Sequence, residues 1–265
     1  MKRRYITYFA VLVALCSIHA EPIEHENILK VRYGWVKQVD PYLSPLVYRG
    51  NEIGIGNEWW QAFRADSAHW SHVGRVDVFG LRASSSAGTN YIYGFGFHGG
   101  WGAHYKWSFA NDRLSLLLGP YIEADFMARE IGTNVNKPVS FDVGLDAIAM
   151  AGLSWSFYGK KTSYRLRYLI RTNLIGFDMM PEYWESYYEV TEGVPETVRC
   201  SGHWNHNVLR HELTLDLQFP HSTWRIGAEH EYLKYGTQHM QYTRNQINII
   251  IGCLWHYRIK ANTRL

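Results

Sequence analysis

The sequence has no uninterrupted run of 18 apolar residues, the length that a membrane-spanning helix requires. It contains only three cysteines in 265 residues, so no disulfide framework is indicated. Neither an H-E-x-x-H motif nor a paired C-x-x-C motif is present. These absences exclude a helical membrane protein, a disulfide-stapled scaffold and the zinc enzymes that carry those motifs.

An excess of charge is also missing once the N-terminal segment is set apart. The basic residues KRR at positions 2–4 precede an apolar run that ends at Leu15 and small residues that end at Ala20. This is the pattern of a secretory signal peptide, and its removal leaves 24 basic and 24 acidic residues. A neutral chain gives no support to nucleic-acid binding. We expect a signal peptide at 1–20 and one exported domain at 21–265.

The stretch 91–109, YIYGFGFHGGWGAHYKWSF, shows what the chain has instead. It contains G-x-G-x-x-G at Gly94, Gly96 and Gly99, but the dinucleotide motif requires a following helix, and nothing helical follows. Its odd positions are mostly aromatic, whereas its even positions are mostly glycine, histidine and lysine. This period of two predicts one very long β-strand between two unlike environments.

Nine further segments are predicted as strands, and six of them alternate clearly between an apolar and a polar face. The six are 114–127, 141–157, 164–174, 207–219, 223–235 and 245–259, and the three weaker ones are 28–37, 53–64 and 71–82. Aromatic residues make up 15% of the chain, as suits a membrane interface. We therefore predict an all-β fold, an antiparallel transmembrane β-barrel of about ten strands, with eight or twelve as alternatives.

The connections between these strands alternate in expected length. Short turns are expected at 110–113, 159–161 and 220–221, and longer connections at 39–50, 83–90, 128–140, 176–206 and 236–244. With ten strands and a periplasmic N-terminus, all the longer connections lie outside the cell, which is the layout of bacterial outer-membrane barrels. We therefore predict a location in the cell outer membrane, with outer-membrane lipid around the barrel.

Two short turns also predict which inward side chains face each other. The turn at 220–221 sets Asp216 opposite Arg225 and Arg210 opposite Glu231, which are favourable cross-strand pairs. The turn at 110–113 sets His98 opposite Asp125. The predicted lumen charge network is His98, Asp125, Arg210, Asp216, Arg225 and Glu231. The first register also sets Glu212 opposite Glu229, which requires a bridging arginine or a proton on one of them. In a narrow barrel such side chains fill the lumen.

The 13 histidines raise the question of catalysis or metal binding. His211 and His230 are the candidates for a catalytic pair, because the same register sets them opposite each other on the nominally lipid-facing side. Polar groups are costly there. No serine neighbours them in this register, so an interfacial or protein-covered contact is the alternative interpretation. The sequence predicts no cofactor and no metal site.

Residues 40–50, DPYLSPLVYRG, resemble a signature near the N-terminus of a family of Bacteroidota outer-membrane β-barrels of unknown function. The matching positions are Asp40, Tyr42, Leu43, Ser44, Pro45, Leu46, Tyr48 and Gly50. The resemblance implies an outer-membrane location and no known chemistry. We expect the stretch itself to be a proline-stiffened loop between the first two strands.

The predicted 176–206 connection is the longest of the chain, and connections of this length are usually functional or disordered. It carries six acidic residues and the aromatic side chains Tyr183, Trp184, Tyr187 and Tyr188. We predict that these aromatic residues bind a protein partner or a glycan, and a solvated loop is the alternative.

These observations favour a non-enzymatic barrel that is a structural or accessory subunit of an envelope complex. Two alternatives stay open. One is an outer-membrane hydrolase that acts on lipid or peptide at the outer rim, and the other is a small-solute channel.

Overall fold

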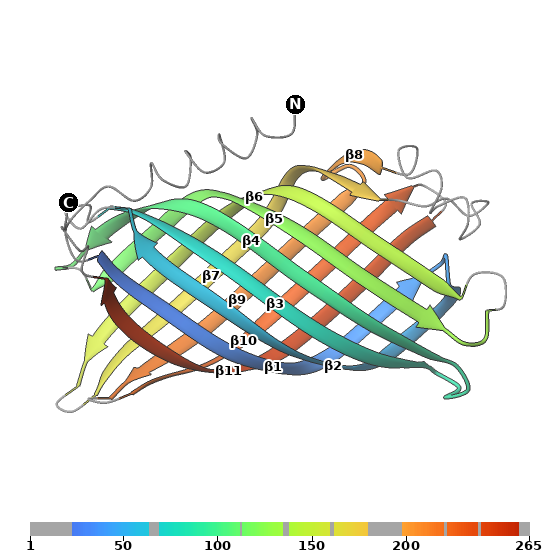
Figure 1. Ribbon diagram of the computed structural model, residues 1–265, viewed down its shortest axis with the longest axis horizontal. Helices are drawn as coiled ribbons and strands as arrows, with labels where there is room; N and C mark the ends of the chain where they lie inside the picture. Colours follow the sequence, from blue (N-terminus) through green and yellow to red (C-terminus); the bar gives the residue numbers. More distant parts are fainter. Residues whose placement is uncertain are drawn as a thin grey trace, which may run out of the picture.

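The computed structural model shows a closed antiparallel β-barrel with steeply inclined strands (Figure 1). It describes residues 23–63, 69–111, 113–134, 138–159, 162–179, 198–219, 222–237 and 240–259. The predicted signal peptide and the four aromatic residues at 183–188 lie outside the described residues. Among the described residues, no helix is long and apolar enough to cross a membrane.

The barrel consists of ten long strands and one short additional strand. The strands are β1 (Ile23–Asp40), β2 (Ser44–Ala62), β3 (Trp70–Ser85), β4 (Tyr91–Phe109), β5 (Leu114–Ile131), β6 (Val139–Tyr158), β7 (Ser163–Met179), β8 (Val198–Gly202), β9 (His206–Gln218), β10 (Thr223–Thr237) and β11 (Met240–Ile259). Each long strand pairs with its neighbours along the chain, and β1 pairs with β11 to close the ring. Among the described residues, β8 pairs with the end of β7.

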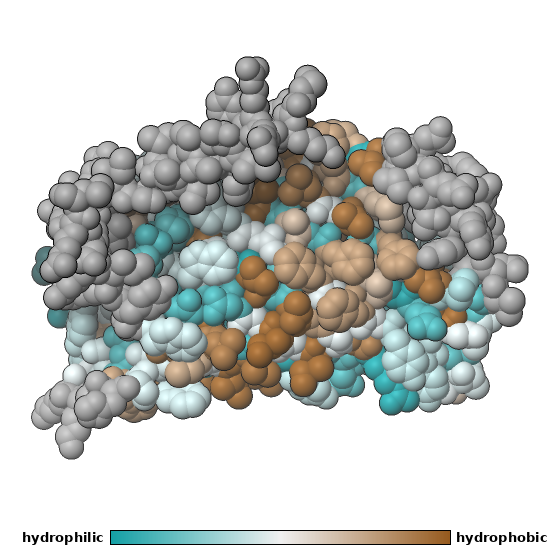
Figure 2. All heavy atoms as spheres, viewed as in Figure 1, coloured by the Kyte–Doolittle hydropathy of each residue, from teal (hydrophilic) through white to brown (hydrophobic). Residues whose placement is uncertain are grey.

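The two faces of the wall differ as the sequence alternation predicts. Large apolar side chains point outward and are about half exposed, among them Trp35, Phe95, Ile122 and Ile251 at 55–56%. Figure 2 shows such side chains spread over the middle of the wall. A closed sheet with this exterior satisfies its backbone groups internally and presents an apolar band to lipid. The predicted fold class, a ten-stranded antiparallel transmembrane β-barrel, is confirmed.

The strands extend further than the sequence analysis predicted. The predicted loop 39–50 is mostly strand, because β2 begins at Ser44, and the predicted loop 236–244 shrinks to residues 238 and 239. The predicted connection 176–206 also contains the end of β7 and all of β8. The predicted sorting of connections by length was therefore wrong for the first and last of these loops. At this end of the strands the usual alternation is reversed, because outward positions such as Lys37, Arg49 and Gln241 are polar, whereas inward positions such as Tyr48 and Tyr242 are apolar.

The barrel has two ends, which are named here by the course of β1: β1 begins at the terminal end and turns into β2 at the far end. Within the resembling stretch 40–50, residues 41–43 form the turn at the far end, and residues 44–50 belong to β2. The Asp40 carboxylate accepts a hydrogen bond from the Tyr42 amide (3.1 Å), and the Asp40 carbonyl accepts one from the Leu43 amide (3.1 Å). Tyr42 and Leu43 are buried in the far-end core.

The far-end core consists of Val36, Tyr42, Leu43, Tyr48, Phe79, Leu81, Ala83, Ile92, Met127, Ile131 and Met240. A second apolar cluster lies nearer the terminal end and consists of Ile28, Trp60, Val73, Leu117, Tyr121, Ile148, Met150, Leu169 and Leu254. Most of the remaining inward side chains are charged or polar. The lumen is thus filled with side chains, as expected for a barrel of about this strand number.

Candidate functional site: the charged lumen

Buried arginines dominate the inside of the barrel. Arg32, Arg75, Arg129, Arg171, Arg210, Arg225 and Arg244 are each at most 4% exposed. A buried charge is tolerated only when it is paired and hydrogen-bonded. The acidic partners of these arginines therefore decide how the lumen is organised.

The Asp216–Arg225 pair shows the predicted hairpin register. These residues are direct neighbours in the β9–β10 ladder, so the predicted register is confirmed. Arg225 donates to both Asp216 oxygens, at 2.6 Å and 2.9 Å, and its third nitrogen donates to Glu58 on β2 at 3.0 Å. All three side chains are fully buried. The bidentate geometry is the strongest form of a carboxylate–guanidinium contact.

Arg75 resolves the unfavourable Glu212–Glu229 pair that the same register predicts. The two glutamates lie opposite each other in the ladder. Arg75, on β3, reaches between them from the other side of the lumen: its nitrogens lie 3.4 Å from Glu212 and 2.8 Å from Glu229. An arginine therefore bridges the two like charges, which was one of the two ways the sequence analysis left open.

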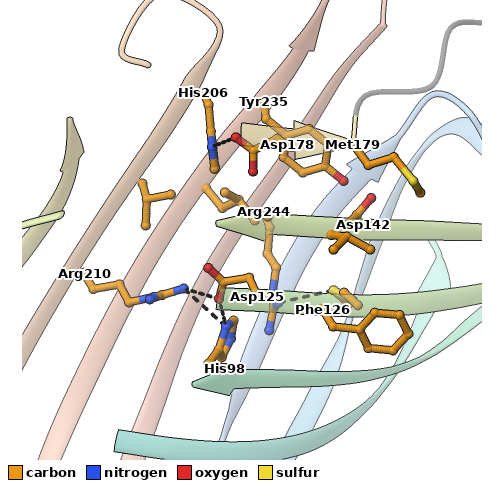
Figure 3. Close-up of a pocket in the computed structure, with 15 residues that line it drawn as sticks. His98, Asp125, Phe126, Asp142, Asp178, Met179, His206, Arg210, Tyr235 and Arg244 are labelled. Atoms are coloured by element: carbon orange, nitrogen blue, oxygen red, sulfur yellow. Dashed lines mark hydrogen bonds and ion pairs between the residues drawn. The ribbon is translucent and has the colours of Figure 1, made fainter. Parts of the chain in front are cut away.

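A third arginine, Arg210, joins the rest of the predicted network. His98 and Asp125 are direct neighbours in the β4–β5 ladder and contact each other through the imidazole Nδ1. Arg210 lies 2.6 Å from Glu231 and 3.3 Å from Asp125, and it also contacts Glu123. Figure 3 shows Arg210 pointing at Asp125 and His98. We call these five residues the Arg210 cluster. Glu123 was not assigned to the network from the sequence, because its partner is 87 residues away.

A second acidic group lies in the same part of the lumen, and the sequence analysis missed it. Asp146 on β6, Asp178 on β7 and His206 on β9 each offer a ligand atom, and these atoms lie within 4.8 Å of one another. The His206 Nδ1 atom is 2.7 Å from Asp178 and 3.6 Å from Asp146. We call these three residues the Asp146 cluster. They form a compact set of two carboxylates and one imidazole.

A cavity of about 40 Å³ lies between the two clusters. Its lining includes His98, Asp125 and Arg210 from the first cluster and Asp178 and His206 from the second. Figure 3 shows these side chains pointing into the same space. A volume of this size holds an ion or a few water molecules, whereas pockets for drug-sized ligands measure roughly 300–1,000 Å³.

The predicted catalytic candidates lie on the other side of the wall. His211 and His230 are direct neighbours in the β9–β10 ladder, and their rings stack with centroids 5.8 Å apart. The hydroxyl of Tyr168 lies 2.6 Å from the His211 Nδ1 atom. The polar contact of this pair is a tyrosine rather than a serine nucleophile. The pair is therefore a stacked polar patch on the outer wall.

With the geometry in place, sequence comparison identifies the family. A family model described as "Protein of unknown function (DUF3316)" matches residues 20–260. The chain belongs to the DUF3316 family. A family without assigned function was expected, but the Bacteroidota origin and the 40–50 signature stay predictions. No curated protein sequence matches this DUF3316 chain.

Solved structures similar to this DUF3316 barrel include an outer-membrane protease and parts of two autotransporters. The outer-membrane protease OmpT from Escherichia coli has 8% identity and a TM-score of 0.49, with 91% of this chain and 97% of that chain covered. The β domain of the Bordetella autotransporter BrkA has 10% identity and a TM-score of 0.43, with 86% and 98% covered. The transport unit of the Escherichia coli autotransporter AIDA-I has 7% identity and a TM-score of 0.42, with 94% and 97% covered. These similarities are too distant to transfer any activity.

Proposed function

We propose that this DUF3316 protein is an outer-membrane barrel with a closed lumen, and that it serves as a non-enzymatic structural or accessory subunit of an envelope complex. The observation that carries the proposal is the series of arginine–carboxylate contacts that join distant strands across the lumen. A barrel built to conduct would require an open aqueous path along its axis.

These contacts occur at successive levels of the barrel. Nearest the terminal end, Arg167 on β7 lies 3.3 Å from Glu26 on β1. In the middle, Arg32 on β1 lies 2.8 Å from Glu229 on β10. Contacts at several heights support a lumen that is blocked along its length rather than at one constriction.

Contacts of the same kind lie at the far end. Arg129 on β5 lies 3.1 Å from Asp40 and 2.5 Å from Asp142. It also donates to the hydroxyl of Tyr235 at 3.0 Å. Because Asp40 holds the first turn, this ion pair fixes the buried Tyr42 and Leu43 over the far end. A closed far end supports a role in which the outer surface, not the lumen, contacts other molecules.

Conductance across planar lipid bilayers tests the closed lumen. The refolded protein is expected to give no sustained ion steps, and the variant Arg75→Ala/Arg210→Ala, if it folds, should conduct more than wild type because two cross-lumen contacts are lost. Sustained steps by the wild-type protein would overturn the closed lumen and favour the small-solute channel.

Fractionation of cells tests the location. The protein should separate with the outer membrane and should show heat-modifiable mobility on gels, because a closed barrel resists detergent until it is heated. Recovery in the soluble periplasmic fraction would overturn an outer-membrane location and, with it, lipid as the surroundings of the wall.

The accessory role rests on a partner, for which the 176–206 connection stays our proposed site. Removal of residues 182–196 should leave the heat-modifiable barrel intact, because the paired strands hold it. The deletion should also abolish cross-linking to the protein or glycan that the full chain captures in intact cells. Equal cross-linking by both forms would remove this segment from the proposal.

Among the described residues, the polar side chain that contacts the His211–His230 pair is Tyr168, not a serine beside the histidine, so we do not propose the hydrolase alternative.

A further inference from the structure

We propose that Asp146, Asp178 and His206 form a binding site for one divalent transition-metal ion inside the barrel. The proposal goes beyond the closed-lumen function and does not depend on it. Three different strands supply the three side chains, and their ligand atoms already lie within 4.8 Å of one another. Only small movements of the side chains would bring all three to a common ion.

The Asp146 carboxylate is the observation that points to a missing ligand. Asp146 is 1% exposed, and neither of its oxygens accepts a hydrogen bond of good geometry. Its polar neighbours are the His206 imidazole, 3.6 Å away, and the side chain of Asn173. No arginine or lysine among the described residues forms an ion pair with it. A buried carboxylate without an arginine or lysine partner is costly, and a bound metal ion would supply positive charge beside it.

Two glycines make the space that the carboxylates occupy. Asp146 lies directly opposite Gly176 in the β6–β7 ladder, and Asp178 lies directly opposite Gly144. A Cβ atom at position 176 would lie 2.2 Å from the Asp146 oxygen, and one at position 144 would lie 2.4 Å from the Asp178 oxygen. Any side chain at either glycine would push the carboxylate away. The side chain of each aspartate thus lies over the glycine opposite it, close to His206.

The ligand types define the class of ion. Two carboxylates with one imidazole suit ions such as zinc, manganese, iron or cobalt, whereas magnesium and calcium prefer oxygen ligands alone. The Nδ1 atom of His206 lies nearest both carboxylates. Metal binding would use the tautomer in which this nitrogen carries the lone pair, so the ion would replace the contact between Nδ1 and Asp178. The adjoining cavity of about 40 Å³ leaves room for water as a further ligand.

Cobalt provides a direct spectroscopic test on the full chain. The protein is refolded in detergent, treated with a chelator, desalted and titrated with Co²⁺. We expect a visible absorption band that saturates at one Co²⁺ per chain and disappears when Zn²⁺ is added. A hundredfold excess of Mg²⁺ or Ca²⁺ should leave the band unchanged.

Variants locate the ion within the lumen. Asp146→Asn and His206→Gln should each weaken Co²⁺ binding by about tenfold or more, since weakening even an outer contact of a metal site typically costs 10–100-fold in affinity. Asp125→Asn is the matched control, because Asp125 lines the same cavity but belongs to the Arg210 cluster. This control should bind Co²⁺ as wild type does. Heat-modifiable mobility confirms that each variant is folded.

Three results would overturn the proposal. The first is a folded wild-type protein that binds no stoichiometric Co²⁺ or Zn²⁺. The second is equal binding by wild type and a folded Asp146→Asn variant. The third is loss of binding in Asp125→Asn alone, which would place the ion in the Arg210 cluster. Conductance is a separate measurement, so failure of the metal site leaves the closed lumen standing.

Discussion

The Arg210 cluster and the Asp146 cluster adjoin the same cavity and are built from similar residue types, yet they balance charge differently. Each contains a histidine beside buried or half-buried carboxylates. In the first, a guanidinium contacts Glu123, Asp125 and Glu231. In the second, the group that can carry positive charge beside Asp146, among the described residues, is the His206 imidazole.

The difference shows that the acids alone do not define a binding site in such a lumen. In the Arg210 cluster, a cation of the protein already occupies the position between the carboxylates, so no external ion is needed. In the Asp146 cluster, glycines stand opposite the two aspartates in the β6–β7 ladder, and Arg199 stands opposite Asp178 in the β7–β8 ladder. No arginine or lysine among the described residues forms an ion pair with Asp146. The position of the protein's own cations therefore separates a structural cluster from a candidate site.

Removal of the cation from the first cluster should have the largest effect. Arg210→Met leaves Glu123 and Glu231 buried without their shared partner. Removing one partner of a buried ion pair typically costs about 3–5 kcal/mol of unfolding free energy. Urea unfolding of the refolded barrel, followed by tryptophan fluorescence, measures this loss. The control is Arg82→Met, since Arg82 is exposed. Equal losses of unfolding free energy in both variants would show that the buried contacts of Arg210 do not stabilise the barrel.

The coupling between Asp216 and Arg225 should be the next largest effect. A double-mutant cycle with Asp216→Asn and Arg225→Gln should give an interaction energy of roughly 0.5–3 kcal/mol, as is usual for residues in direct contact. Both side chains are fully buried and share two hydrogen bonds. Zero coupling in unfolding measurements would mean that the side chains do not meet inside the lumen.

When metal is absent, Asp146→Asn should not lower the unfolding free energy, in contrast to Asp216→Asn. Asp146 has no arginine or lysine partner among the described residues, so neutralising it removes a desolvation cost, whereas Asp216→Asn breaks an ion pair with an arginine. We expect the unfolding free energy of chelator-treated Asp146→Asn to stay equal to wild type or to rise by about 1 kcal/mol. Asp216→Asn, measured in parallel, should lower it. A marked loss in Asp146→Asn would show that the carboxylate already has a stabilising partner.

The sequence predicted much of the first cluster because hairpin register follows from turn length. Short turns leave few ways to pair two strands, so Asp216–Arg225 and His98–Asp125 could be placed from the alternation alone. Turn length does not determine which side chains meet across the lumen, so these contacts could not be predicted in this way. The need for an arginine beside Glu212 could be stated, but Arg75 is 137 residues away and could not be named.

The Asp146 cluster could not be predicted, because Asp178 and His206 fall in the predicted 176–206 connection and the β6–β7 register is irregular. The β6–β7 register shifts between Ala147 and Ile148, so that both Leu174 and Ile175 are about half exposed. Without this bulge, the short turn after β6 would set Asp146 opposite Ile175 rather than Gly176. A bulge changes which residues face inward beyond it, and the sequence carries no local mark of it. The alternation of residues 164–174 therefore could not be continued to Asp178.

Removing the polar contact on the outer wall should change the unfolding free energy least. It tests whether polar contacts outside the lumen matter as much as those inside it. His211 also meets a hydrogen-bonding partner, the Tyr168 hydroxyl at 2.6 Å, but Tyr168 is 39% exposed. Hydrogen bonds within membranes average about 0.6 kcal/mol in double-mutant cycles, so Tyr168→Phe should lower the unfolding free energy by about that amount. The aromatic ring and its stacking on His211 are kept in this variant, so urea unfolding isolates the hydroxyl. A loss of unfolding free energy as large as that of Arg210→Met would show that the outer wall depends on specific polar contacts as strongly as the lumen does. It would also indicate that this face is covered by something other than lipid.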